Sequence, residues 1–225
     1  MGIFSILSSE LPALEIIIML LAWVIAIVVA LVAHEYMHAF TAYKCGDSTA
    51  KINGRMTLNP VKHFELSGFL CMLIIGFGWA KGVPVDERNF RDVKKGRIWV
   101  SLSGVLMNLF LGVVFIILTV ILLHYFSMTD VLILKFLIYL CMYSGMINII
   151  LGIFNFLPIY PLDGFNFVSA FLRYENKYCQ FMRKYGAMIL FGILIVSAFI
   201  PEIGLGQLFG AIYYWLFDIF SMLLF

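Results

Sequence analysis

The sequence predicts an all-α polytopic membrane protein with about five or six membrane segments. Of its 225 residues, 63% are hydrophobic and only 12% are charged, and the mean hydropathy of +1.02 lies far outside the range of soluble domains. Several apolar runs also approach the roughly 20 residues that a helix needs to cross a bilayer. We therefore expect one integral membrane domain over residues 1–225, with a core over 11–165 and C-terminal helices over 185–225.

Charge and cysteine content exclude several other classes of protein. The formal net charge is only +2, and no glycine-rich phosphate loop accompanies it, so the sequence gives no support for a nucleic-acid partner. The four cysteines are widely separated and form no CxxC pair. We expect free thiols at these positions, because a disulfide framework or a thiolate zinc site would need closer pairing.

The first membrane segment spans about Leu11 to Tyr43. Every residue from Ile16 to Ala33 is apolar, which is close to the length of one bilayer crossing. No Gly or Pro interrupts the chain between Ala13 and Cys45, so we expect the helix to continue beyond the apolar run.

This helix carries His34, Glu35 and His38 at its inner end. Residues four apart lie on one face of a helix, so both imidazoles can reach one metal ion while Glu35 stands beside it. The HExxH spacing is that of a zinc site with a glutamate base, although it also occurs by chance in soluble helices. A carboxylate at depth in a membrane helix costs roughly 2.5–3.5 kcal/mol, which favours a functional role for Glu35.

The next segments are shorter and less regular. The connection over 44–66 is polar and contains Gly and Pro, as expected of an ordered loop outside the hydrocarbon. The stretch 67–80 is apolar, but glycines interrupt it and it is too short for a full crossing, so we expect a re-entrant segment near 67–85. Within it, Gly76–Val85 favours extended backbone, which could offer an edge for a substrate strand.

Two further crossings are expected at about 98–123 and 131–156. The first contains Asn108, an intramembrane amide that needs a hydrogen-bond partner. The second ends in a stretch with Asn155, two prolines and Asp163, where the prolines should unwind the helix. Apolar segments over 187–200 and 205–225 complete the predicted set.

Basic residues cluster on connections that one topology places on the same side of the membrane. They lie at 44–62, 81–97 and 173–184, with only Lys135 outside these stretches. The positive-inside rule makes this side cytoplasmic. We therefore expect the N-terminus outside, the C-terminus inside and both polar motifs at the cytoplasmic end.

Asp163 is the best candidate for a third zinc ligand. Hydrolytic zinc usually takes three protein ligands and keeps a fourth position for water. Asp163 is ionisable, follows a helix break and lies at the same expected depth as His34 and His38. Taken alone, it would more often be an ordinary turn residue before Gly164.

Together the two stretches resemble the site-2 protease family of intramembrane zinc metalloproteases, over about Ala33 to Phe165. The sequence is especially similar to the compact prokaryotic branch that carries GRLTLNP, GFGWAKPVPV and AGPLANL stretches. The resemblance implies one Zn²⁺ held by three residues, a general base, and two asparagines in the catalytic site. The implied ligands are His34, His38 and Asp163, the base is Glu35, and the asparagines are Asn155, which would assist the oxyanion, and Asn108.

The resemblance further implies a multi-pass protein of a prokaryotic cell membrane that cuts single-pass membrane proteins in or near their transmembrane segments. Val105, Gly82 and Tyr160 stand where the family often has proline, so we expect local backbone shape and substrate fit to differ there. Two alternatives remain open, a metal- or ion-translocating protein and a catalytically silent scaffold that binds helices. The absence of a repeat argues against the first, and an intact Glu35 against the second.

The remaining features carry less weight. We expect His63 and His124 to be interfacial polar residues and not metal ligands. The lipid bilayer is an implied partner, and the sequence leaves homo-oligomer formation open.

Overall fold

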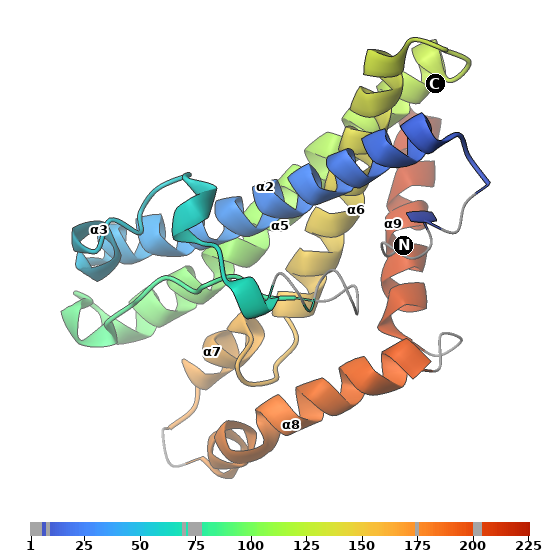
Figure 1. The fold of residues 1–225 in the computed structure, drawn as a ribbon. Helices are drawn as coiled ribbons and strands as arrows, with labels where there is room; N and C mark the ends of the chain where they lie inside the picture. Colours follow the sequence, from blue (N-terminus) through green and yellow to red (C-terminus); the bar gives the residue numbers. More distant parts are fainter. Residues whose placement is uncertain (1–5, 8–9, 69–70, 72–77, 174–175, 200–203) are drawn as a thin grey trace.

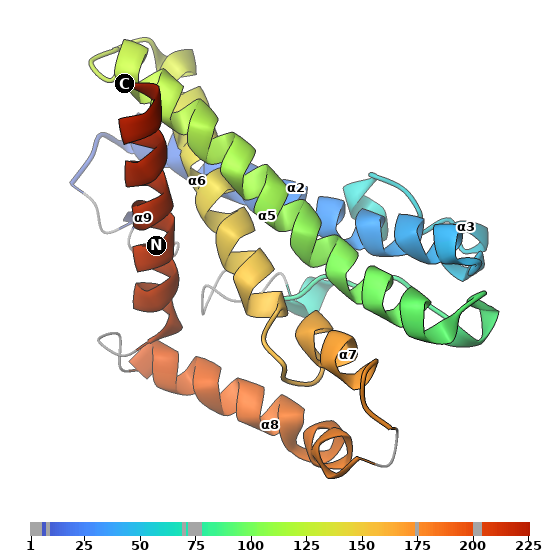
Figure 2. The same ribbon diagram turned by 180° about the vertical axis from the view of Figure 1, so that it is seen from behind.

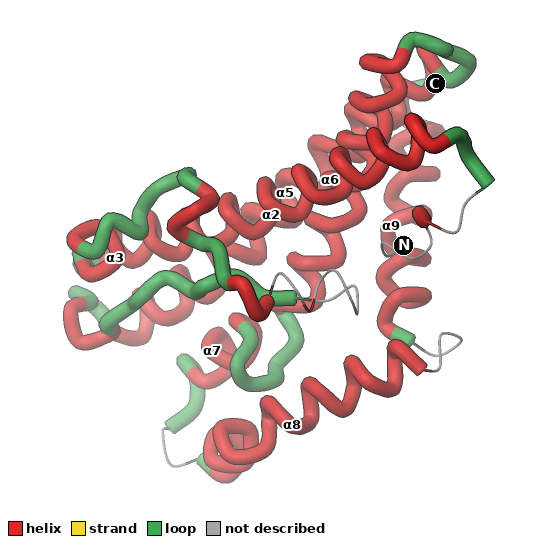
Figure 3. Tube along the Cα trace, viewed as in Figure 1, coloured by secondary structure: helices red, strands yellow, loops and turns green. Residues whose placement is uncertain are grey.

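The computed structural model describes residues 6–7, 10–68, 71, 78–173, 176–199 and 204–225. Within these residues the chain is helical and contains no strand (Figure 3). The helices are α2 (Ala13–Cys45), α3 (Thr49–Ile52), α5 (Val93–Phe126), α6 (Leu132–Asn155), α7 (Asp163–Ser169), α8 (Lys177–Phe199) and α9 (Leu205–Leu224), with 3₁₀ turns η1 (Pro60–Lys62) and η2 (Glu87–Asn89).

Five described helices are long and apolar enough to cross a membrane, namely α2, α5, α6, α8 and α9. The chain is therefore an all-α, multi-pass membrane protein, as the composition predicts. Helices α2, α5 and α6 pack closely on one another and form the core of the bundle, whereas α8 extends away from them (Figures 1 and 2).

Small residues allow α5 and α6 to approach closely. A Cβ on Gly112 of α5 would lie 2.6 Å from Ile149 of α6, and one on Gly145 of α6 would lie 3.2 Å from Ile116 of α5. Such small residues are typical of helix contacts in membranes, where close packing supplies much of the association energy.

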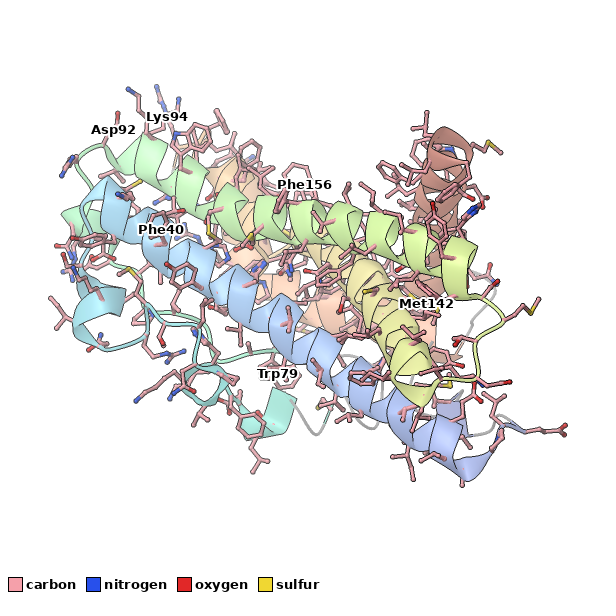
Figure 4. All side chains as sticks on the ribbon, turned by 90° about the horizontal axis from the view of Figure 1, so that it is seen from above. Phe40, Trp79, Asp92, Lys94, Met142 and Phe156 are labelled. Atoms are coloured by element: carbon pink, nitrogen blue, oxygen red, sulfur yellow. The ribbon has the colours of Figure 1, made fainter. Side chains whose placement is uncertain are left out.

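Specific residues end α2 and begin α5. Gly46 ends α2 with φ 116°, a left-handed conformation that glycine adopts without a Cβ penalty. The side chain of Asp92 then caps α5 by accepting a hydrogen bond from the backbone N–H of Lys95. Figure 4 shows Phe40 of α2 at the same end of the bundle as Asp92 and Lys94.

The predicted crossings agree with four of these helices. The segments expected at 11–43, 98–123, 131–156 and 205–225 correspond to α2, α5, α6 and α9. Residues 69–70 and 72–77 of the predicted re-entrant segment lie outside the described residues, and the end of the segment, 79–85, has no regular secondary structure. The segment expected at 187–200 belongs to a longer helix, because α8 already begins at Lys177.

The expectation that the C-terminus lies at the same end of the bundle as the two polar motifs was wrong. The ring of Phe225 stacks on His124 near the end of α5, with ring centroids 3.6 Å apart. At 1.5 Å per residue along α5, this contact lies about 30 Å from Gly104, which adjoins the two HExxH histidines. Residue 225 therefore lies at the opposite end of the bundle, because α9 packs along α5 and α6 and its contacts, not its length, determine where it ends.

Candidate metal centre

Three predicted ligand atoms converge at one point. The Nε2 atoms of His34 and His38 are 2.9 Å apart, and Oδ2 of Asp163 lies 3.1 Å from each of them. His34 and His38 are buried, and Asp163 is half-buried. These residues form the one cluster of potential metal ligands found in the described part of the chain.

Asn108 orients His34 from behind. Its Oδ1 lies 2.5 Å from Nδ1 of His34, and its Nδ2 donates to the backbone oxygen of Ala30 at 3.1 Å. Because the amide nitrogen is directed elsewhere, Oδ1 is the atom that faces the imidazole and must accept from an Nδ1–H. In the neutral imidazole, Nε2 is then the unprotonated nitrogen, and it is the one that His34 turns toward the centre.

His38 is held in the same way by a backbone carbonyl. Its Nδ1 lies 2.7 Å from the oxygen of Val100 in α5, and a carbonyl oxygen can only accept. The proton is therefore on Nδ1, and Nε2 faces His34 and Asp163. Metal-binding histidines characteristically donate their second ring N–H to such an acceptor.

Gly104 lets the two imidazoles lie against α5. A Cβ at this position would stand 2.6 Å from Cε1 of His34 and 2.6 Å from Nε2 of His38. No side chain other than hydrogen fits there without displacing a ring. Sequence periodicity alone does not reveal this role, because it depends on the relative register of α2 and α5.

Asp163 reaches the centre from the first position of α7. The adjoining Gly164 permits a tight approach, since a Cβ there would lie 2.1 Å from the backbone oxygen of Phe156. Its Oδ2 thereby faces the Nε2 atoms of both histidines.

These residues fit a divalent metal. Two imidazole nitrogens and a carboxylate oxygen face one another with their lone pairs, and such an arrangement is repulsive unless a cation lies between them. Two histidines and a carboxylate form one of the usual ligand sets of catalytic zinc, which keeps a fourth position for water or substrate.

His34, His38 and Asp163 form what is here called the ligand triangle. Glu35 lies beside this triangle but is not part of it. Its Oε2 accepts a hydrogen bond of 2.8 Å from the backbone N–H of Val83. The segment before Val83 is held by Arg55, whose Nη2 donates to the carbonyls of Lys81 and Gly82 at 2.5 and 3.3 Å. Arg55 thus holds the segment Lys81–Val83, here called the strap, which contacts the predicted base Glu35.

The centre opens into a polar cavity of about 440 Å³. Its lining includes the ligands, Glu35, Asn155 and Gly82, and also an ion pair between Arg97 and Glu87. Asn155 is present as predicted, although its Nδ2 here donates to the backbone oxygen of Leu151 at 3.0 Å. Its predicted role at the oxyanion stays a prediction.

Other predicted residues lie elsewhere. Asn108 is fully buried behind His34 and is not among the cavity-lining residues, which suits a positioning role better than direct catalysis. His63 hydrogen-bonds the backbone oxygen of Thr57 at 2.8 Å, and His124 stacks on Phe225. Neither belongs to the ligand cluster. All four cysteines are free thiols, as expected.

Part of the backbone edge that the sequence predicts for a substrate strand is already hydrogen-bonded within the protein. Within the described part of Gly76–Val85, the N–H of Lys81 bonds the oxygen of His63 at 2.9 Å, and the N–H of Val83 bonds Glu35. At Gly82, a Cβ would meet nothing within 4 Å. The N–H groups of Lys81 and Val83 are therefore already used within the protein and are not free to pair with a substrate strand.

Comparison with known proteins identifies the family. The model of peptidase family M50 matches residues 22–197, which include all the converging side chains. The chain belongs to peptidase family M50, the site-2 protease family. No solved structure gave a significant match.

Curated M50 relatives carry names that agree with this site. The chain is 38% identical over 149 residues to "Putative zinc metalloprotease YwhC" of Bacillus subtilis, covering 65% of this chain and 67% of the relative. It is 31% identical over 198 residues to "Putative zinc metalloprotease Rip2" of Mycobacterium tuberculosis, covering 85% and 71%. This M50 chain is accordingly a metalloprotease, and five helices in the part that the structure describes are long enough to cross a membrane.

Proposed function

We propose that this M50 protein uses one zinc ion to hydrolyse peptide bonds in or near the transmembrane segments of single-pass membrane proteins. The observation that carries the proposal is the position of the ligand triangle. His34 and His38 lie on α2, a helix of membrane-crossing length, and Asp163 meets them from the segment after α6. A substrate held in the bilayer could reach such a centre without leaving the membrane.

The residues divide the chemistry between them. Zinc, held by His34, His38 and Asp163, would polarise the scissile carbonyl and lower the pKa of a coordinated water to about 7. Glu35 would take the proton of the attacking water and return it to the leaving amine. The N–H of Val83 holds one oxygen of the Glu35 carboxylate, which leaves the other for proton transfer.

The substrate must lose its helical hydrogen bonds before it can be cut. A helical carbonyl is already bonded within its own segment, so the scissile stretch has to unwind inside the cavity. The polar lining near Asn155 and the open side at Gly82 offer room for extended backbone there. Helix-breaking residues in a substrate should accordingly speed its cleavage.

We further propose that the metal centre lies toward the cytoplasm of a prokaryotic cell. The basic connections around 44–62 and 81–97 are at the same end of the bundle as the centre, and the positive-inside rule assigns that end to the cytoplasm. The N-terminus would then lie outside.

Purified protein in lipid vesicles provides the test. It should cut a single-pass substrate, lose this activity when zinc is chelated and regain it when zinc is restored. Mass spectrometry of the products should place the cut in or next to the transmembrane segment. Cleavage confined to a soluble part of the substrate, or ion transport without cleavage, would reject the proposal.

A further inference from the structure

We propose that Asn148 is a positioning residue of the metal centre, which acts through Asn108 to fix the nitrogen that His34 presents to the metal. Asn148 lies in α6, is fully buried and does not line the cavity. The inference rests on the proposed zinc-dependent function. It adds a third helix to the support of a ligand that is carried by α2.

A chain of hydrogen bonds links Asn148 to the ligand. Nδ2 of Asn148 donates to the backbone oxygen of Ser144 at 2.8 Å. Oδ1 of Asn148 accepts from Nδ2 of Asn108 at 2.8 Å. Oδ1 of Asn108 lies 2.5 Å from Nδ1 of His34.

The first bond of this chain determines the direction of the others. A carbonyl oxygen can only accept, so the nitrogen of Asn148 must face Ser144 and its oxygen must face Asn108. Asn108 then has to turn its nitrogen toward Asn148 and its oxygen toward His34. The proton of His34 is thereby held on Nδ1, and Nε2 is free to bind metal.

Ala30 and Asn148 both accept hydrogen bonds from the Asn108 amide, and Ala30 alone cannot replace Asn148. The amide nitrogen of Asn108 carries two hydrogens, and the oxygens of Ala30 and Asn148 accept from it at 3.1 and 2.8 Å. Without Asn148, one N–H of Asn108 would be left unpaired in a fully buried position, which is costly away from water. The Asn108 amide would then be held by Ala30 alone, and the orientation of His34 would be less firmly fixed.

A positioning role for Asn148 differs from a packing role, because it predicts an energetic coupling between Asn148 and Asn108. Outer partners of metal-binding histidines typically contribute about 10–100-fold to metal affinity. If Asn148 acts only through Asn108, its removal should matter when Asn108 is present and have no further effect when Asn108 is absent. A residue that merely fills space would weaken the protein to a similar extent in both backgrounds.

The test is a double-mutant cycle with zinc affinity as its readout. Full-length wild type, Asn148→Leu, Asn108→Leu and the double variant would be purified in detergent, and their zinc dissociation constants measured by competition with a chromophoric chelator. Ser144→Ala is the matched control, since it alters a buried side chain in the same helix but keeps the backbone oxygen that Asn148 uses. Melting of the zinc-free proteins would be recorded in parallel.

We expect each single leucine variant to weaken zinc binding by about tenfold or more. The double variant should match Asn108→Leu within about twofold, and Ser144→Ala should match wild type. Unchanged affinity in Asn148→Leu, or losses that multiply in the double variant, would overturn the inference. If Asn148→Leu does not fold, Asn148→Ala replaces it in the same cycle.

Failure of the inference can be told apart from failure of the proposed function. Wild-type protein that binds zinc and cuts its substrate, together with an Asn148 variant of normal affinity, rejects only the positioning role. Wild-type protein that binds no zinc rejects the function itself.

Discussion

At the scale of single residues, the two histidines of α2 depend on α5 for their orientation. Asn108 and Val100 accept their Nδ1 protons, and Gly104 makes room for their rings. The HExxH spacing puts two imidazoles on one face, but these contacts decide that both Nε2 atoms point at Asp163. The geometry of the metal centre is therefore determined by the packing of α2 against α5.

Asp163→Ala removes the proposed ligand that comes from outside α2. Two neutral histidines would remain, without a charged ligand to hold the cation. We expect this variant to lose most of its zinc and its activity, measured as metal per chain and as cleavage rate. Asp130→Ala is the control, because Asp130 is an exposed carboxylate on the α5–α6 connection. Full zinc content in Asp163→Ala would exclude Asp163 as a ligand.

Gly104→Ala tests the fit of the imidazoles against α5. The added methyl group would lie 2.6 Å from both His34 and His38, so at least one ring must move. Zinc affinity should fall by about tenfold or more, as for other disturbances of ligand orientation. Gly192→Ala is the matched control, since a Cβ there meets nothing within 4 Å. Equal zinc affinities in the two variants would contradict the described packing.

The sequence predicts some of these residues and not others for a clear physical reason. The positions of His34, Glu35 and His38 on one helix face follow from helical periodicity alone. Asn148 is also visible as an amide in an apolar helix, which is a signal of an intramembrane hydrogen bond. That it contacts Asn108, and through it His34, follows only from the register of α5 against α6.

At the scale of elements, a buried carboxylate fastens the connection after α2 to the turn before α5. Asp47 is fully buried and accepts hydrogen bonds from the backbone N–H of Asp86, the side chain of Asn89, and both the N–H and hydroxyl of Thr49. Because Asp86 closely follows the strap that contacts Glu35, this cluster also limits how far the strap can move.

Asp47→Asn should lower the melting temperature near neutral pH. Burial alone would raise the pKa of Asp47, but the hydrogen bonds from Thr49, Asn89 and Asp86 lower it below its ordinary 3.8. The charged form therefore contributes stability above that pH, and the contribution is lost as the pH falls through the lowered pKa. Hydrogen bonds to a charged group suggest a loss of about 1.5–3 kcal/mol.

The pH dependence supplies the check on this interpretation. Thermal unfolding of wild type and Asp47→Asn should differ most near pH 7, and the difference should shrink as the pH falls below about 4, the unfolded pKa, and through the lowered folded pKa. A difference that stays constant down to pH 3 would show that the charge of Asp47 is not the source of the stability.

At the scale of the whole molecule, the composition and the apolar runs predict the class of fold and its three central helices. They could not predict where residue 225 lies, because hydropathy gives the length of a crossing but not its packing partner. The described contacts place Phe225 against His124 at the end of α5. The orientation of the bundle in the membrane stays a prediction based on the basic connections.

Cysteine labelling tests that orientation. Met128 is 95% exposed on the α5–α6 connection, and Ile52 is 82% exposed on the connection after α2. With an impermeant thiol reagent, Met128→Cys should react in intact cells, whereas Ile52→Cys should react only after permeabilisation. Wild type gives the background from the native cysteines. The reverse pattern would invert the proposed topology.

The central claim is that Glu35 serves as the general base of a zinc peptidase, and Glu35→Gln tests it most directly. The substitution keeps shape and volume, and the amide oxygen can still accept from the N–H of Val83, but the proton acceptor is lost. General-base assistance is worth about 10²–10⁴ in rate. We therefore expect a folded variant that binds zinc and captures substrate, yet cleaves a single-pass substrate at least about a hundredfold more slowly. Cleavage by Glu35→Gln at the wild-type rate would contradict the account.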